Sequence, residues 1–500
     1  MKISPLLRRS LFSFLLALST VARAEYAWTT NCVAAWEQLS RLNFNETDRL
    51  LIAEKTSHPQ NQLPEYIRSQ AEFIRTFIYE EKADFETLKT NNELRISNLE
   101  KDATRSPYQR FCIAEMYLQL TVAKIKFKEY LGAAYDVRKA YKLLEENRKI
   151  YPDFPPNLRG LGLLHAAVGA VPKNYQWMAG ILGLSGSIHQ GLNELKSLYN
   201  SANANNEFAF LKEESVVMLT FLEINLGKEK NLTPLRQRFY RLKQLNKKPL
   251  LVFAKCNLHA YAAENDSIIY QLSAREQSAD AGQLPYLTYM EANARLHNLE
   301  PVAEKYYLEY LQRYKGKSYR QSSLQRMAWG RLIQHDEAGY RKYIALINKD
   351  EAAESADEDK SAVKEANSGE LPNIILLKAR LLFDGGYYQR ALSEIAGKPI
   401  TLFSRLKDQL EFTYRFARIM DKTGNHEKAI QYYQLTLKNG AAQTYYFAAN
   451  SALLLAQLYE DRGDKANAIQ YYKTTLSMRN HEFQNSIDQK AKAGINRLGE

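Results

Sequence analysis

The chain has 500 residues and a formal net charge of +12, and four of its basic residues lie in the first 24 positions, which leaves an excess of +8 for the remainder. That excess is modest, and basic residues are mixed with acidic ones, so the sequence does not indicate a nucleic-acid-binding surface. Cys32, Cys112 and Cys256 are too few for a disulfide framework. Whether two of them form a disulfide stays open, and the core must come from packing.

The first 24 residues have the organisation of a secretory signal peptide. A basic start is followed by an apolar stretch at 11–21 and by the small-residue cleavage motif Ala22-Arg23-Ala24. The uninterrupted apolar run is too short to span a bilayer as a membrane anchor. The sequence therefore predicts an exported protein whose mature chain begins at Glu25. We expect it in the periplasm, associated with the outer membrane, or secreted.

From residue 25 onward the apolar residues recur with a period near 3.6, and no convincing run of alternating strand residues occurs. Residues 106–149 predict one long helical hairpin, which prolines at 152, 155 and 156 stop. Residues 26–90 and 208–264 predict further helix pairs. The chain is therefore expected to be all-α, with an irregular helical-hairpin region over 25–348.

Residues 160–193 stand out because they contain Lys173 as their only formal charge and seven of the 22 glycines of the chain. One interpretation is a pair of buried helices whose glycines permit close approach of the two backbones. The alternative is an apolar docking patch with Tyr175, Trp177 and Met178 at its rim.

Residues 349–370 contain many acidic residues and no aromatic residue. This composition is typical of an exposed linker or of a surface helix. We therefore expect an acidic linker here, between the region 25–348 and a C-terminal array over 371–500.

The C-terminal array is internally repeated. The pentapeptide that begins at Ala429 recurs at Ala468, 39 residues later, and each copy has a glycine five positions upstream. An earlier copy has Ala391 in the same place. This spacing predicts two helices joined by a glycine turn, with small residues between paired helices and Tyr433 and Tyr472 between successive hairpins.

The repeat resembles the tetratricopeptide repeat, whose unit is about 34 residues long. The surplus of about four or five residues falls between hairpins. The resemblance implies an α-solenoid of helical hairpins, whose concave face is lined by the first helix of each hairpin and binds other proteins. It places nine residues in a partner-binding groove, here called the predicted groove set: Asn373, Arg380, Phe383, Tyr414, Arg418, Asp421, Asn450, Gln457 and Glu460.

A second resemblance rests on the glycine-rich step at 182–186, on Tyr310 to Lys315 and on Asp384 to Tyr388. These residues are similar to a signature of the eukaryotic inclusion-body-clearance-like tetratricopeptide-repeat family. The likeness implies the same superhelix and, loosely, a role in protein quality control or membrane association. The export signal departs from that family and puts an intracellular role in doubt.

No motif for catalysis is present. The eight histidines form no HExxH arrangement, and the sequence has no Walker loop, no G-x-S-x-G elbow and no complete dinucleotide fingerprint. We therefore expect no enzymatic activity, no cofactor and no metal. The leading interpretation is an exported scaffold for protein–protein interaction in the cell envelope. The alternative is an envelope protein that contacts membrane or lipid through residues 160–193.

Overall fold

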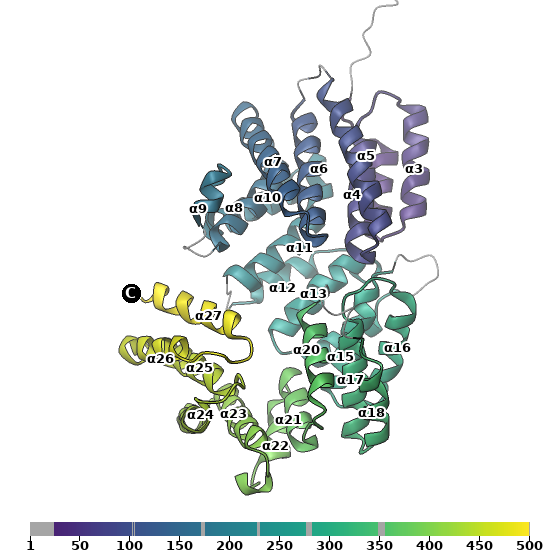
Figure 1. Cartoon of the computed structure of the whole chain (residues 1–500). Helices are drawn as coiled ribbons and strands as arrows, with labels where there is room; N and C mark the ends of the chain where they lie inside the picture. The colour runs from purple at the N-terminus through teal and green to yellow at the C-terminus, as the bar shows by residue number, and fades with distance from the viewer. Residues whose placement is uncertain are drawn as a thin grey trace, which may run out of the picture. The chain divides into compact units, whose positions relative to one another are not determined.

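The computed structural model describes residues 25–102, 104, 106–171, 176–227, 231–276, 283–348 and 356–499. These residues form 25 α-helices and no strand, apart from one isolated bridge between Glu25 and Asn61. The all-α prediction is confirmed (Figure 1). The predicted signal peptide lies outside the described residues. None of the helices within the described ranges is both long and apolar enough to cross a membrane.

The chain divides into two compact units. Unit 1 comprises Met1–Leu258, Gln271–Leu287 and Tyr314–Gly316, and unit 2 comprises His259–Tyr270, Thr288–Arg313 and Lys317–Glu500. Helices pack in antiparallel pairs along both units. In unit 1, up to its border, these helices are α2 Thr30–Ser40, α3 Phe44–Ser57, α4 Leu63–Tyr79, α5 Lys82–Glu100, α6 Pro107–Lys126, α7 Tyr130–Ile150, α8 Asn157–Ala170, α9 Gln176–Ile181, α10 Ile188–Ala204, α11 Lys212–Leu222, α12 Thr233–Tyr240 and α13 Pro249–Tyr261.

The border between the units runs through α13, α14 and α15, and unit 2 continues from there to the C-terminus. Its helices are α14 Asn265–Ser273, α15 Pro285–His297, α16 Ala303–Arg313, α17 Arg320–Ile333, α18 Glu337–Ala345, α20 Asp357–Ser368, α21 Ile374–Asp384, α22 Tyr388–Ile395, α23 Leu406–Lys422, α24 His426–Gly440, α25 Phe447–Asp461, α26 Lys465–Ser477 and α27 Gln484–Arg497.

The glycine-rich segment forms most of α8, the short α9 and the start of α10, and α8 and α10 pack closely on each other. A Cβ atom on Gly191 would lie 2.3 Å from the carbonyl oxygen of Gly162, so only glycine fits at this crossing. The interpretation as closely packed helices is thus confirmed for this pair. Of the proposed apolar patch, Tyr175 and the side chain of Met178 lie outside the described residues, and Trp177 is 62% exposed.

The predicted repeat is present as the hairpins α21/α22, α23/α24 and α25/α26. Gly386, Gly424 and Gly463 occupy the turns with φ of +81°, +82° and +78°, a conformation that residues with a Cβ rarely adopt. Directly after each of the last two glycines, the side chain of Asn425 or Asp464 accepts a hydrogen bond from the first turn of the next helix. The glycine and the cap together explain where each turn falls.

Small residues separate the paired helices, as the spacing predicted. Ala417, Ala429, Ala456 and Ala468 are all fully buried, as are the rings of the two repeated tyrosines, Tyr433 and Tyr472. The tyrosines fill space that the alanines leave open, so packing holds the hairpins together.

Replacing Ala429 with leucine should overpack the α23/α24 hairpin, because three added carbons have no room at a fully buried position. We expect a loss of about 1–3 kcal/mol in the free energy of unfolding. Ala466→Leu on the exposed face of α26 is the matched control and should change that energy by less than about 0.5 kcal/mol. Equal effects in urea unfolding would show that Ala429 is not a close contact.

The expected acidic linker requires correction. Residues 357–368 form α20, which packs on α17, and the fully buried Asp359 accepts hydrogen bonds from the backbone N–H groups of Tyr319 (2.6 Å) and Ser322 (2.7 Å) at the start of α17. The acidic side chain thus caps a neighbouring helix. Of the two interpretations, an exposed linker or a helix, the helix is therefore right for residues 357–368. The border between the two compact units falls within 258–317 and not at 349–370.

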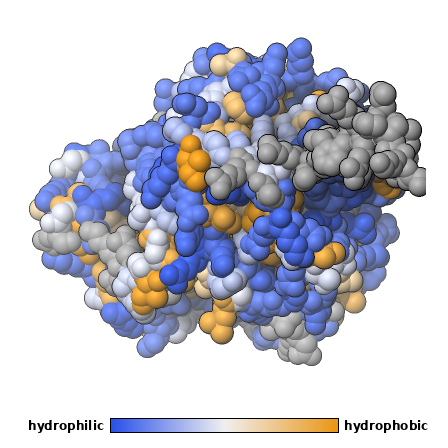
Figure 2. Space-filling view, turned by 90° about the horizontal axis from the view of Figure 1, so that it is seen from above, coloured by the Kyte–Doolittle hydropathy of each residue, from blue (hydrophilic) through white to orange (hydrophobic). Residues whose placement is uncertain are grey.

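The three cysteines are buried free thiols, and no disulfide joins them. Figure 2 shows that the visible face of the molecule is mostly hydrophilic, with hydrophobic residues scattered over it.

Candidate functional site

A groove lies within unit 2, where α17, α20, α21, α23 and the start of α25 approach one another. It encloses about 290 Å³ and is partly open to solvent. Basic and acidic side chains line it in equal number, together with four aromatic rings, and we call it the unit 2 groove. The charged lining residues are Arg326, Glu358, Lys364, Glu365, Arg380, Arg405, Lys407, Asp408, Glu411, Arg415 and Glu482, with Glu370 in the loop between α20 and α21.

Glu365 of α20 organises one wall of the groove. Its carboxylate accepts hydrogen bonds from the indole N–H of Trp329 (2.9 Å) and the hydroxyl of Tyr340 (2.9 Å), and from the amide of Gln325 (2.7 Å). The guanidinium of Arg380 lies over the indole ring of Trp329, at 4.7 Å from the centre of that ring. This cation–π contact holds Arg380 on the wall while its side chain stays 41% exposed.

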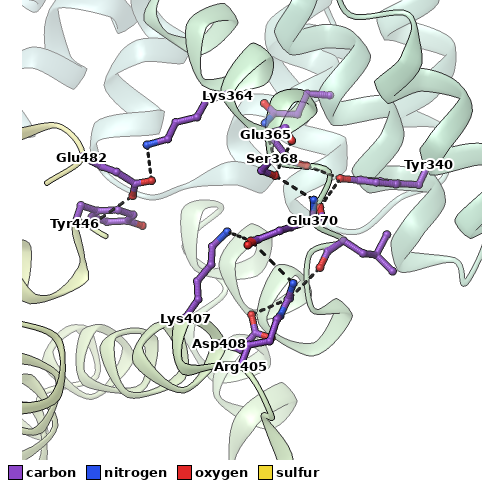
Figure 3. A network of polar contacts seen from close by, with 12 residues as sticks. Tyr340, Lys364, Glu365, Ser368, Glu370, Arg405, Lys407, Asp408, Tyr446 and Glu482 are labelled. Carbon is purple, nitrogen blue, oxygen red and sulfur yellow. Dashed lines mark hydrogen bonds and ion pairs between the residues drawn. The ribbon is translucent and has the colours of Figure 1, made fainter. Parts of the chain in front are cut away.

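Ion pairs bridge the groove between separate elements, as Figure 3 shows. Lys407 contacts Glu370 at 2.6 Å, and Lys364 contacts Glu482 at 2.6 Å. The hydrogen bond from Lys407 holds the pKa of the Glu370 carboxyl below its usual value. Such partly exposed pairs are individually weak, so a ligand with charges of its own can exchange partners with them at little cost.

An aromatic side chain stands at the rim of the groove. The side chain of Phe483 is 56% exposed. Its backbone has a φ of +56°, which a residue with a bulky side chain seldom adopts. Its ring packs edge-on against Tyr446 with 5.4 Å between the ring centres. A large apolar side chain that is anchored and still exposed offers a partner a rigid contact.

The structure places only two members of the predicted groove set at this groove. Asn373 and Arg380 line it, and the Asn373 side chain also caps α21 by accepting hydrogen bonds from the N–H groups of Ile375 and Leu376. Phe383 and Tyr414 were wrongly placed at the surface, because their side chains are 7% and 1% exposed and belong to the core of unit 2.

The other members are engaged within the protein. Arg418 lies 4.1 Å above the ring of Phe383, and Asn450 donates a hydrogen bond of 2.5 Å to the hydroxyl of Tyr414. Asp421 accepts a hydrogen bond from Tyr433 (3.5 Å), and Glu460 pairs with Arg497 at 2.8 Å. Gln457 is partly exposed and does not line the unit 2 groove.

The error is one of helix rotation. On α23 the groove is lined by Asp408, Glu411 and Arg415, whereas the sequence analysis chose Tyr414, Arg418 and Asp421. Tyr414 and Arg418 each follow a groove-lining residue by three positions, and three residues turn an α-helix by about 300°, which equals about 60° in the opposite direction. The face of α20 that lines the groove was also missed, although residues 358, 361, 365 and 368 recur at helical spacing.

Within the described ranges no cluster of three or more His, Cys, Asp or Glu side chains is arranged to hold a metal ion. The unit 2 groove offers ion pairs, hydrogen bonds and aromatic contacts.

His297 at the end of α15 packs against Gly385 at the end of α21. A Cβ atom added to Gly385 would lie 2.9 Å from the Cβ of His297. Burial lowers the pKa of His297 from 6.5 to about 4, with Asp384 opposing the shift and Arg326 and Arg380 reinforcing it. The unfolded chain therefore binds a proton that the folded protein excludes. The associated stability is complete above pH 6.5 and is lost as the pH falls towards 4, by up to about 3 kcal/mol.

The measurement is the urea midpoint at pH 7.5 and pH 4.5, for the wild type and for His297→Gln. The difference between the two pH values should be smaller in the variant, which has no imidazole to protonate. An identical pH dependence in both proteins would contradict the assignment.

Comparison with known proteins supports the repeat. Residues 451–485, which span most of α25 and all of α26, match the family model of the tetratricopeptide repeat. No curated protein matches the chain. The resemblance to the inclusion-body-clearance-like family stays a prediction.

Two solved structures are similar over most of their length. The human IFIT1 dimer with m7Gppp-AAAA has 14% sequence identity and a TM-score of 0.31, covering 94% of this chain and 96% of that one. The APC/C hetero-tetramer Cut9–Hcn1 has 11% identity and a TM-score of 0.23, covering 98% of each chain. Likenesses this weak say nothing about function.

Proposed function

Because this chain carries a tetratricopeptide repeat at residues 451–485, we propose that it is an exported, non-enzymatic scaffold that binds a protein partner through the unit 2 groove. The observation that carries the proposal is the lining of that groove. Six basic and six acidic side chains line it, and Trp329 and Phe483 add an apolar contact at the wall and at the rim.

This lining favours an extended peptide segment of mixed charge. Arg380 can pair with an acidic partner residue while it keeps its contact with Trp329, and Glu370 and Glu482 can pair with basic ones. Phe483 supplies an exposed apolar side chain at one end. Charged groups at fixed positions set which segment fits and in which register.

The test compares substitutions in the groove with matched substitutions outside it. Arg380→Ala and Phe483→Ala should each weaken partner binding at least tenfold, because they remove a held cation and an aromatic anchor. The controls are Arg341→Ala, which removes a 63% exposed arginine of α18, and Tyr270→Ala, which removes a 76% exposed tyrosine of α14.

All four variants should unfold within a few degrees of the wild type. Affinities are measured by calorimetry with a partner that has been identified by crosslinking in envelope extracts. If groove and control variants bind that partner alike, the groove is not the binding surface.

Export is the second part of the proposal and rests on the pattern of the first 24 residues. Mass spectrometry of the protein from cell fractions should find a mature N-terminus at Glu25. A mature protein that retains residues 1–24 would contradict export.

The alternative function is contact with membrane or lipid through 160–193. The observation that favours it is α9, where Trp177 and Ile181 are 62% and 69% exposed. Trp177→Ser should abolish flotation with liposomes if α9 inserts, whereas the scaffold proposal predicts no flotation of the wild type in high salt.

A further inference from the structure

A second hollow lies in unit 1. It encloses about 300 Å³ among α2, α4, α11 and α13, and we call it the unit 1 cavity. Its walls are apolar, and Phe77 and Val122 on its lining remain 50% and 41% exposed. The other apolar walls include Trp36, Phe73, Val217 and Met218.

The size of the cavity limits what it can hold. An apolar cavity of about 150 Å³ in another protein stays dry and takes up benzene, which has six carbon atoms. The unit 1 cavity is about twice as large, so a ligand of about ten to twelve carbon atoms would fill it. Met218 contributes a flexible, polarisable side chain that adapts to the shape of such a ligand.

One end of the cavity carries charge. The buried Arg159 contacts Glu115 and, at 2.8 Å, Glu214, and the buried Lys248 contacts Glu213 at 2.6 Å and Glu37 at 2.7 Å. Glu37 also pairs with Arg41 at 3.1 Å, so three cations meet four carboxylates, an excess of one negative charge.

The neighbouring carboxylates affect the pKa of Glu213. Burial raises the pKa of the Glu213 carboxyl, and the neighbouring Glu37 and Glu214 raise it further although Lys248 lowers it. One oxygen of the fully buried Glu115 has no hydrogen-bond partner among the described residues. A positive charge placed here would be stabilised, whereas an added anion would be repelled.

We propose that the unit 1 cavity binds a linear apolar chain of about ten to twelve carbon atoms that carries a positively charged group at one end. The chain lies between Phe73 and Val217, and the cationic group lies beside Glu213 and Glu214. A fatty-acid anion of the same length fits the walls equally well but places a carboxylate against the carboxylates of the protein.

The experiment uses the full chain and three probes of equal length, dodecylammonium, dodecanol and dodecanoate, each below its micelle concentration. Isothermal titration calorimetry should show one dodecylammonium bound per chain, at least tenfold more tightly than dodecanoate, with dodecanol between them. Equal affinities for the two ions, or tighter binding of dodecanoate, would overturn the proposal.

Two variants locate the site. Val217→Trp should abolish binding by filling the cavity, whereas Leu94→Trp at a 61% exposed position of α5 should leave it unchanged. Glu213→Gln removes the excess negative charge and should lower the preference for dodecylammonium over dodecanoate at least threefold, while Lys248 keeps Glu37 as its partner.

The control for the charge is Glu86→Gln, which changes a 47% exposed glutamate of α5. Undiminished binding to Val217→Trp would show that the probes bind elsewhere and would overturn the assignment. The preference in the wild type is decisive even if a variant fails to fold.

Discussion

Replacing Tyr472 with alanine is expected to lower the free energy of unfolding by about 3–5 kcal/mol, the range for large aromatic side chains in a core. The ring is fully buried and packs against α27 so closely that a Cβ on Gly494 would lie 2.2 Å from its Cζ atom. Its hydroxyl also donates a hydrogen bond to Glu460. Truncation therefore leaves a cavity and removes a polar contact in one step.

The measurement is urea unfolding followed by circular dichroism. Tyr433→Ala, the equivalent change one repeat earlier, should show a similar loss, because that ring is fully buried too. Tyr270→Ala at a 76% exposed position is the control and should stay within about 0.5 kcal/mol. A loss of the same size in the control and in Tyr472→Ala would mean that the tyrosines do not hold the hairpins together.

Replacing Arg159 with methionine is expected to lower the free energy of unfolding by about 3–5 kcal/mol, because it leaves buried carboxylates without their cation. Arg159 is 7% exposed and contacts Glu115, which is fully buried, and Glu214. Removing the carboxylate charge together with the cation should recover a large part of the loss. The double variant Arg159→Met with Glu115→Gln tests this in the same urea experiment. A single variant as stable as the wild type would show that the charge is not enclosed.

The repeat could be predicted from the sequence because each of its parts has one physical role. A turn with φ near +80° admits glycine, and a close helix contact admits alanine, so Gly424 and Ala429 recur with their spacing intact. The helical hairpins around them follow from the period of the apolar residues alone.

The groove could be predicted only in part, because the side of a helix that becomes a surface depends on what packs beside it. Tyr414 has the position of an inner-face residue in the repeat, yet it is enclosed by the adjacent hairpin and hydrogen-bonded to Asn450. Glu365 was assigned to a linker by composition, although it fixes Trp329 and Tyr340 in place. Such contacts between distant segments leave no local signal.

The unit 1 cavity was invisible in the sequence for a related reason. Phe73, Val217 and Met218 have the same periodic spacing as core residues, and only the arrangement of α2, α4, α11 and α13 leaves space between them.

The central claim, that the unit 2 groove binds a protein partner, is tested most directly by photo-crosslinking in cells. A benzophenone amino acid is placed at Phe483 on the rim or, as control, at Tyr270 on the exposed face of α14. The account predicts one discrete crosslinked protein from position 483, and that product should disappear when Arg380→Ala is added. Crosslinking from position 270 that matches position 483, or a product that persists in the Arg380→Ala background, would contradict it.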